Sequence, residues 1–200
     1  MSQTSPTALV RGVEVHGPRL IQLDVAAEEL VDRVPEIGSG TGQHAVHVAR
    51  LHPQLQWQCC DQAEYLPGIQ QWLDEAKLDN LPAPQPFEVN SSPWPSGDFQ
   101  ALYSANTLHI MSWASVERLF ARIAEHGADL QWLFIYGPFN YQGQFTSASN
   151  AEFDQWLKSR DPMSGIRDAE AVSGLAAKAG FALHSDCEMP ANNRLLIWKR

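Results

Sequence analysis

Three glycines at alternate positions, Gly38, Gly40 and Gly42, follow a short apolar run that begins at Val34. A side chain at any of them would hinder a tight backbone turn and would keep a ligand away from the backbone amides. Their spacing therefore indicates a loop that binds a nucleotide-like cofactor. Because glycine loops are common, the residues around this loop decide how the pattern is interpreted.

Three polar residues stand at or just after the ends of other predicted strands: Asp61, Glu88 and Asn106. In a parallel α/β sheet, ligands bind outside the carboxyl ends of the strands, so we expect these residues and the glycine loop at one edge. Asp61 lies 19 residues after Gly42, where an acid can accept hydrogen bonds from ribose hydroxyls. The alternative for Asp61 is a helix N-cap.

The glycine spacing distinguishes between two cofactors. A dinucleotide fingerprint, GxGxxG, would place a third glycine at position 43, where the chain has Gln43, and the loop instead reads GxGxG. This favours S-adenosylmethionine over NAD. Glu36 precedes the loop and is placed to favour the positive charge of a sulfonium; the alternative is a carboxylate that merely ends a strand.

The composition fits one soluble domain. The chain has 200 residues with 44% hydrophobic content, and its net charge of −9 argues against nucleic acid or an anionic membrane as a partner. There is no leader-like or membrane-spanning run, so we expect a cytoplasmic protein that acts on a small molecule or another protein. The three cysteines predict reduced thiols, and the seven histidines lack ligand spacing, so no metal site is expected.

Apolar periodicity predicts strands that alternate with helices, and therefore a mainly parallel sheet covered on both faces. Pro35 falls inside the first strand, where it removes a backbone donor. The expected helices cover 20–34, 43–51, 65–76, 116–123 and 168–179, and the expected strands cover 34–37, 55–60, 87–89, 99–105, 130–136, 181–185 and 195–199.

We expect a single domain over residues 1–200 with two departures from this alternation. Residues 1–19 mix Ser, Thr, Pro and Gly with few apolar residues and predict a loosely held arm. Residues 139–167 are rich in Asn, Gln, Ser and aromatics, with one short helical piece over 151–157. We interpret them as an insertion over the ligand edge, and residues 187–194 as a loop between the last two strands.

The segment Glu36–Gly42 resembles motif I of class I methyltransferases, and a wider set of motifs is similar to the family of methyltransferase-like protein 26, formerly described as a domain of unknown function. The similarity extends from about Val34 to Arg200. The motifs that carry it are EIGSGTGQHAVH over 36–47, Trp57 with Asp61, Trp94-Pro95, Asn106 to Ile110, Tyr136 to Phe139, Ser149-Asn150-Ala151 with Phe153-Asp154, Arg160-Asp161-Pro162, Gly165 to Asp168, and Met189 to Asn193.

The resemblance implies a three-layer Rossmann-like fold whose seven-stranded sheet is mostly parallel with a C-terminal antiparallel strand, and it implies S-adenosylmethionine as cofactor. Three departures stand out: Glu88 where the family usually has Asp, Pro35 where it has Leu, and no counterpart of its Arg-Asn lead-in. Carried over by position, the resemblance implies that the methionine end of the cofactor is held by Glu36, Gly38, Gly40 and Gly42. It implies that Asp61 binds the ribose and that Glu88 and Val89 contact the adenine. Asn106 would lie beside the sulfonium.

Methyl transfer requires an aligned nucleophile and, for many acceptors, removal of its proton. His109 follows the fourth strand, and a neutral imidazole suits the role of base; a histidine hydrogen-bonded inside a loop is the alternative. Arg167 could bind a substrate carboxylate, or it could pair with Asp161 or Asp168 and hold the insertion in shape. The residues expected to line the acceptor pocket are Tyr136, Asn140, Tyr141, Arg167 and Asn192.

The sequence therefore predicts an S-adenosylmethionine-dependent methyltransferase. Two alternatives stay open. A binding protein could keep the cofactor pocket and lack catalysis, and an NAD-linked oxidoreductase would fit the sheet but not the GxGxG spacing. The sequence does not identify the methyl acceptor.

Overall fold

The computed structural model describes residues 31–200. The arm expected over 1–19 and most of the helix expected over 20–34 lie outside the described residues, and the last two residues of that expected helix belong instead to the first strand. The elements in order are β1 (Arg33–Ile37), α1 (Gln43–Leu51), β2 (Gln56–Asp61), α2 (Leu66–Ala76), β3 (Gln85–Pro86), β4 (Ala101–Ala105), α3 (Trp113–His126), β5 (Trp132–Gly137), β6 (Phe139–Asn140), α4 (Ala148–Arg160), β7 (Arg167–Asp168), α5 (Ala169–Lys178), β8 (Ala182–Met189), a 3-10 turn (Pro190–Asn192) and β9 (Asn193–Lys199).

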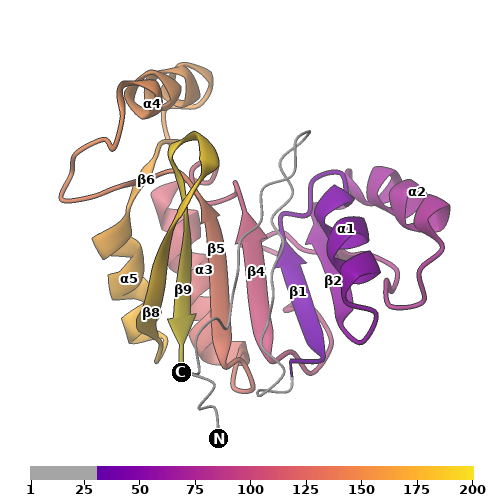
Figure 1. The fold of residues 1–200 in the computed structure, drawn as a ribbon. Coiled ribbons are helices and arrows are strands. Elements are labelled where there is room, and N and C mark those ends of the chain that lie inside the picture. Colours follow the sequence, from indigo (N-terminus) through magenta and orange to yellow (C-terminus); the bar gives the residue numbers. More distant parts are fainter. Residues whose placement is uncertain (1–30) are drawn as a thin grey trace, which may run out of the picture.

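A seven-stranded sheet in the order β3-β2-β1-β4-β5-β9-β8 forms the centre of the molecule (Figure 1). The neighbours from β3 to β5 pair in parallel, and β9 pairs antiparallel with both β5 and β8. The expected α/β class, with a mostly parallel sheet and an antiparallel C-terminal strand, is confirmed. A second, two-stranded parallel sheet joins β6 to β7 beside it.

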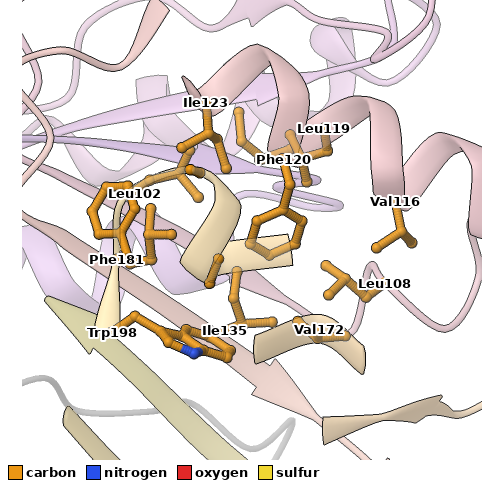
Figure 2. Packing of buried hydrophobic residues seen from close by; sticks show 14 of the residues in the cluster. Leu102, Leu108, Val116, Leu119, Phe120, Ile123, Ile135, Val172, Phe181 and Trp198 are labelled. Carbon is orange, nitrogen blue, oxygen red and sulfur yellow. The ribbon is translucent and has the colours of Figure 1, made fainter. Parts of the chain in front are cut away.

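Two apolar clusters fill the space between the sheet and its helices. Side chains of α1 and α2 pack on one face, and side chains of α3 and α5 pack on the other. In the second cluster, the α3 stripe Val116, Leu119, Phe120 and Ile123 faces Ile135 of β5 (Figure 2). This spacing of three and four residues is the apolar face that the sequence predicted for the helix.

Three expected elements differ from the structure. Phe87–Val89 is no strand: β3 comprises Gln85–Pro86, and the following residues pack under α3. The helix expected over 151–157 is the longer α4, whose buried residues are mainly polar, namely Asn150, Asp154 and Leu157. The loop expected over 187–194 is largely strand: β8 extends to Met189 and β9 begins at Asn193, and on the edge strand β8 the side chains of Cys187 and Met189 are only partly buried against an apolar cluster.

Pro35 lies within β1 and restricts its pairing on one side only. β1 pairs with β2 at five positions but with β4 at one, Glu36 opposite Tyr103. The Arg33 carbonyl accepts from Gln100 on the β4 side, and alternate residues of a strand face the same neighbour, so Pro35 also faces β4. The missing donor therefore shortens the β1–β4 pairing and leaves the β1–β2 pairing complete.

Within residues 31–200, no helix is both long enough and apolar enough to cross a membrane.

Replacing Pro35 by valine should change the free energy of unfolding by no more than about 1 kcal/mol. The restored N–H can add one hydrogen bond to β4, worth roughly 0.5–1.5 kcal/mol, and the more flexible unfolded chain offsets roughly 0.4–1 kcal/mol of it. Urea unfolding measures the sum, and hydrogen exchange at residue 35 reports the new bond. A loss above about 2 kcal/mol would show that the proline ring itself is required.

Candidate functional site

A cavity of about 670 Å³ opens at the carboxyl ends of β1, β2 and β4. This volume is within the range of small-molecule sites. The structure brings six of the eight predicted cofactor residues together in its lining: Gly38, Gly40, Asp61, Glu88, Val89 and Asn106. The other two, Glu36 and Gly42, lie behind the lining.

The three glycines of the loop are required for different reasons. Gly38, at φ +77°, passes so close to Thr107 that a Cβ would come 2.4 Å from the hydroxyl oxygen. Gly42, at φ +82°, precedes α1, and a Cβ there would lie 3.2 Å from Ile69. A Cβ on Gly40 would meet nothing within 4 Å, because this residue faces the open cavity. The loop thus presents backbone to a ligand without a side chain in between.

Asp61 ends β2 and holds the glycine loop. Its Oδ2 accepts a hydrogen bond from the Gly40 amide at 2.7 Å, and its Oδ1 accepts one from the Gln62 amide at 2.7 Å. Burial raises the pKa of the carboxyl, and the two amide bonds oppose this rise. A carboxylate has about four acceptor sites, so Asp61 retains capacity for the hydroxyls of a bound ribose.

The Glu88 carboxylate forms hydrogen bonds with residues of its own loop. Its Oε2 accepts from the Asn90 amide at 3.0 Å and from the Ser91 hydroxyl at 2.8 Å, and its own amide donates to the Ser92 hydroxyl at 2.8 Å. The carboxylate therefore stabilises the turn after Phe87–Val89 as well as lining the cavity.

Arg122 supports the same segment from behind and was not found by sequence reasoning. This α3 side chain is 4% exposed, donates to the Val89 carbonyl at 3.0 Å, and lies 5.0 Å from the centre of the Phe87 ring. A buried cation is costly unless it is hydrogen-bonded, so this contact fixes the position of Val89. The only signal in the sequence is a charged residue beside the apolar stripe of α3.

Asn106 adopts a left-handed backbone conformation, with φ +54°, directly after β4. Its amide donates to the Tyr136 carbonyl of β5 at 2.8 Å. Non-glycine residues in this conformation are uncommon and concentrate at functional sites. The conformation ends the strand sharply at the wall of the cavity.

Glu36 is fully buried and reaches the cavity through a neighbour. Its Oε2 accepts from the Trp57 indole N–H at 3.0 Å, and its Oε1 lies 3.1 Å from His44 Nδ1. His44 in turn lines the cavity. Sequence reasoning quoted Trp57 only as part of a motif, and the structure shows its role as the hydrogen-bond donor to this carboxylate.

His109 is buried beside the cavity and is not part of its lining. Its ring contacts Phe153 edge to face, with the ring centres 5.4 Å apart. Burial, followed by the charge of Arg167, lowers the pKa of His109 to about 4. The imidazole is therefore neutral at pH 7, as a base must be, but it is a weaker base than a solvated histidine.

The residues predicted for the acceptor divide into separate groups. Tyr141 and Asn192 line a second cavity, of about 450 Å³, between the β8–β9 hairpin and the insertion. The Tyr136 hydroxyl accepts from the Asn193 side-chain amide at 3.0 Å, at the edge of that cavity. The Oδ1 of Asn140 is buried, and no described residue forms a hydrogen bond with it.

Arg167 lies apart from both cavities and binds the loop after β4. Its guanidinium donates to the carbonyls of Leu108 and Met163, both at 3.0 Å, and to that of Met111. Burial lowers its pKa. The side chain thus connects the insertion to the segment that carries His109, through backbone carbonyls rather than through an ion pair with Asp161 or Asp168.

The described residues contain no group of three or more histidines, cysteines or acids that could hold a metal ion. Cys59 and Cys60 are free and fully buried, and burial raises the pKa of both thiols.

The fold is that of class I S-adenosylmethionine-dependent methyltransferases. The chain superposes on SibL in its apo form (TM-score 0.70, 20% identity), on an O-methyltransferase family 2 protein from Planctomyces limnophilus in complex with apigenin (0.73, 17%), and on human N-acetylserotonin methyltransferase in complex with S-adenosylmethionine (0.70, 15%). These matches cover 84–85% of this chain and 48–50% of the other chains. The chain therefore spans about half the length of those structures.

Residues 19–200 match the family model described as a protein of unknown function, DUF938, and the chain belongs to this family. That description assigns no activity, so the function must be argued from the site.

The close approach of Gly38 to Thr107 predicts a strong effect of Gly38→Ala. The added methyl must displace Thr107, and the left-handed backbone costs about 1–2 kcal/mol more. We expect a lower free energy of unfolding and at least a roughly tenfold weaker binding of S-adenosylhomocysteine by calorimetry. Gly143→Ala is the matched control, since Gly143 lies in the insertion, has φ +72°, and offers open space within 4 Å of where its Cβ would stand. Equal effects of both substitutions would contradict the steric argument.

The lowered pKa of His109 predicts acid sensitivity. The His109 imidazole binds a proton near pH 6.5 in the unfolded chain but only near pH 4 in the folded protein. Its contribution to the free energy of unfolding is therefore fully present above pH 6.5 and is lost as the pH falls toward 4. Between about pH 7.5 and about pH 5, His109 should account for about 2 kcal/mol of lost unfolding free energy.

Urea unfolding at these two pH values measures the change. The loss should be smaller by that amount in His109→Asn, and it should remain in His184→Asn, which alters an exposed histidine on β8. The same loss in wild type and His109→Asn would assign the acid sensitivity to other groups.

Proposed function

We propose that this protein is an S-adenosylmethionine-dependent methyltransferase that acts on a small molecule or a protein. One observation carries the proposal: a single cavity gathers the glycine loop, Asp61 from β2, Glu88 and Val89 after β3, and Asn106 after β4. These segments are far apart in the sequence. Together they offer backbone amides, a carboxylate that can accept from ribose hydroxyls, and apolar side chains such as Phe87 and Val89, which match the parts of this cofactor.

The donor set fits S-adenosylmethionine by its chemistry. The open face of Gly40 admits the methionine end, Asp61 can accept from the ribose hydroxyls, and Phe87 with Val89 can contact the adenine. Glu36 contributes negative charge behind His44, which suits a cationic sulfonium. The bound cofactor would supply an electrophilic methyl group, and the protein would supply orientation and exclude water.

Other features agree with methyl transfer. The motifs from Glu36 to Asn193 resemble the family of methyltransferase-like protein 26, and the structural neighbours include enzymes named for small acceptors, N-acetylserotonin methyltransferase and mitomycin 7-O-methyltransferase. The net charge of −9 disfavours a nucleic-acid or membrane-bound acceptor. His109 is the candidate base, and it would act from beside the cavity.

Two other functions have specific tests. A noncatalytic binding protein would bind the cofactor tightly without turnover. An NAD-linked oxidoreductase would bind NAD. The GxGxG spacing disfavours this function, because Gln43 stands where the dinucleotide fingerprint has its third glycine.

Isothermal titration calorimetry with S-adenosylmethionine, S-adenosylhomocysteine and NAD tests the cofactor. We expect binding of the first two, and binding of NAD alone would contradict the proposal. Asp61→Ala should weaken S-adenosylhomocysteine binding by roughly 10–100-fold, since it removes a charged acceptor and loosens Gly40. Asp79→Ala, which removes an exposed carboxylate between α2 and β3, is the control and should bind normally.

Turnover distinguishes an enzyme from a binding protein. Incubation of the protein with cell extract and methyl-labelled S-adenosylmethionine should label an acceptor, and Asp61→Ala should abolish the label. Tight cofactor binding without any labelling would favour the noncatalytic alternative.

A further inference from the structure

The loop after β4 presents consecutive backbone carbonyls to one short segment of the insertion, residues 164–167. The four hydrogen bonds run from Arg167 to the Leu108 carbonyl at 3.0 Å, from the Gly165 amide to the His109 carbonyl at 2.9 Å, from the Ser164 hydroxyl to the Ile110 carbonyl at 3.1 Å, and from Arg167 to the Met111 carbonyl. Every carbonyl of residues 108–111 therefore accepts a hydrogen bond from the insertion.

The same loop contributes an apolar wall to the cavity at the glycine loop. Ile110 and Met111 both line this cavity. Met111 packs against an apolar core cluster, whereas the Ile110 side chain is 56% exposed. These side chains have no strong hydrogen-bonding group, so they can contact a ligand only by packing against it. Apolar walls are typical of pockets that bind small molecules.

Hydrogen bonds place this wall beside the segment proposed to contact the adenine. Ser115, four residues after Met111, lines the cavity, and its hydroxyl accepts from the Asn90 side-chain amide at 3.1 Å. The same amide donates to the Glu88 carboxylate at 3.3 Å. Met111 also packs against the cluster that contains Val89. Residues 110–115 and 87–90 therefore line adjacent parts of the cavity.

Arg167 binds both ends of this loop. Its guanidinium donates to three carbonyls, those of Leu108, Met111 and Met163. A guanidinium presents five N–H donors in a fixed fork, so one side chain sets the position of the loop relative to the insertion. Leu108 and His109 are buried, so their carbonyls would lose their donors unless the loop moved to find others. The described residues of the insertion do not line the cavity themselves, so the insertion acts on it through the loop.

We propose that Arg167 is a positioning residue for the cofactor. Together with residues 164–165 it fixes Ile110 and Met111 as an apolar wall that contacts the adenine, so the insertion sets the affinity of a cavity that it does not line. This inference rests on the proposed function, because it takes S-adenosylmethionine as the ligand of the cavity. It adds two packing contacts to those expected from residues 88–89.

Calorimetry with S-adenosylhomocysteine and with adenosine, at a temperature at which all variants are folded, tests the inference. Arg167→Gln should weaken binding of both ligands at least roughly tenfold, because three carbonyls lose their donor and the wall moves away from the base. Arg167→Lys should give an intermediate affinity, since an ammonium cannot reproduce the planar fork. Ile110→Ala shortens the wall itself and should weaken binding of both ligands roughly threefold.

Arg200→Gln is the matched control. Arg200 follows β9 and also binds three backbone carbonyls, those of Gly127, Ala128 and Ala179, each at 2.9 Å. In Figure 1 the C-terminus lies at the end of the sheet opposite the carboxyl ends of β1, β4 and β5. This substitution should lower the free energy of unfolding, as Arg167→Gln does, and should leave both affinities at the wild-type value.

The outcomes separate this inference from the proposed function. If wild type does not bind S-adenosylhomocysteine, both are overturned. A merely structural role lowers stability without changing the Kd of the folded protein, so equal affinities in wild type, Arg167→Gln and Arg200→Gln overturn the inference alone. A loss for S-adenosylhomocysteine without a matching loss for adenosine would contradict the contact with the base. If Arg167→Gln does not fold, Ser164→Ala decides: it removes the donor to the Ile110 carbonyl and should weaken binding roughly threefold, and unchanged affinity would overturn the inference.

Discussion

The cavity proposed to hold the cofactor depends on the hydrogen bonds that attach the glycine loop to the end of β2. The Gly38 amide donates to the Cys60 carbonyl at 2.9 Å, the Cys60 amide donates to the Ser39 hydroxyl at 3.0 Å, and the Gly40 amide donates to Asp61 at 2.7 Å. These bonds continue the β1–β2 pairing beyond the last residue of β1. The loop therefore has a fixed position before any ligand arrives, and Asp61 serves both the fold and the site.

The sequence predicted the parts of the fold in which apolar periodicity coincides with burial, and the part of the site that is made of loop glycines and strand-end residues. The α3 stripe and the alternation of strands and helices are such cases. It predicted only residues 151–157 of α4 and not its full length, because a buried face that carries Asn150 and Asp154 gives no apolar period. It also gave no role to Arg122, because the hydrogen bond that stabilises this buried cation is made to the Val89 carbonyl, 33 residues away. Such contacts arise only once the chain has folded.

Directed hydrogen bonds hold the insertion in addition to the packing of its buried apolar side chains. Asp154 accepts from the Ile166 amide at 2.8 Å and pairs with Lys158, and Arg167 binds three carbonyls, two of them in the loop after β4. The Gly165 amide also donates to the His109 carbonyl at 2.9 Å. Because such bonds require definite geometry, the insertion and the His109 loop form one connected unit, although Arg167 and Leu108 are 59 residues apart in the chain.

The shortened pairing at Pro35 has a consequence for the whole sheet. With a single residue pair between β1 and β4, other hydrogen bonds join the two strands: the Gln100 amide donates to the Arg33 carbonyl at 3.3 Å, and the Ser104 hydroxyl donates to the Ile37 carbonyl at 2.8 Å. The cavity at the glycine loop lies where these two strands end, with Gly38 and Asp61 on the β1–β2 side and Asn106 on the β4 side. A ligand that contacts both sides would add interactions between β1 and β4, where Pro35 lacks a backbone donor. Any ligand that binds only the folded protein in this cavity would therefore raise the free energy of unfolding, in proportion to the logarithm of its concentration over its dissociation constant.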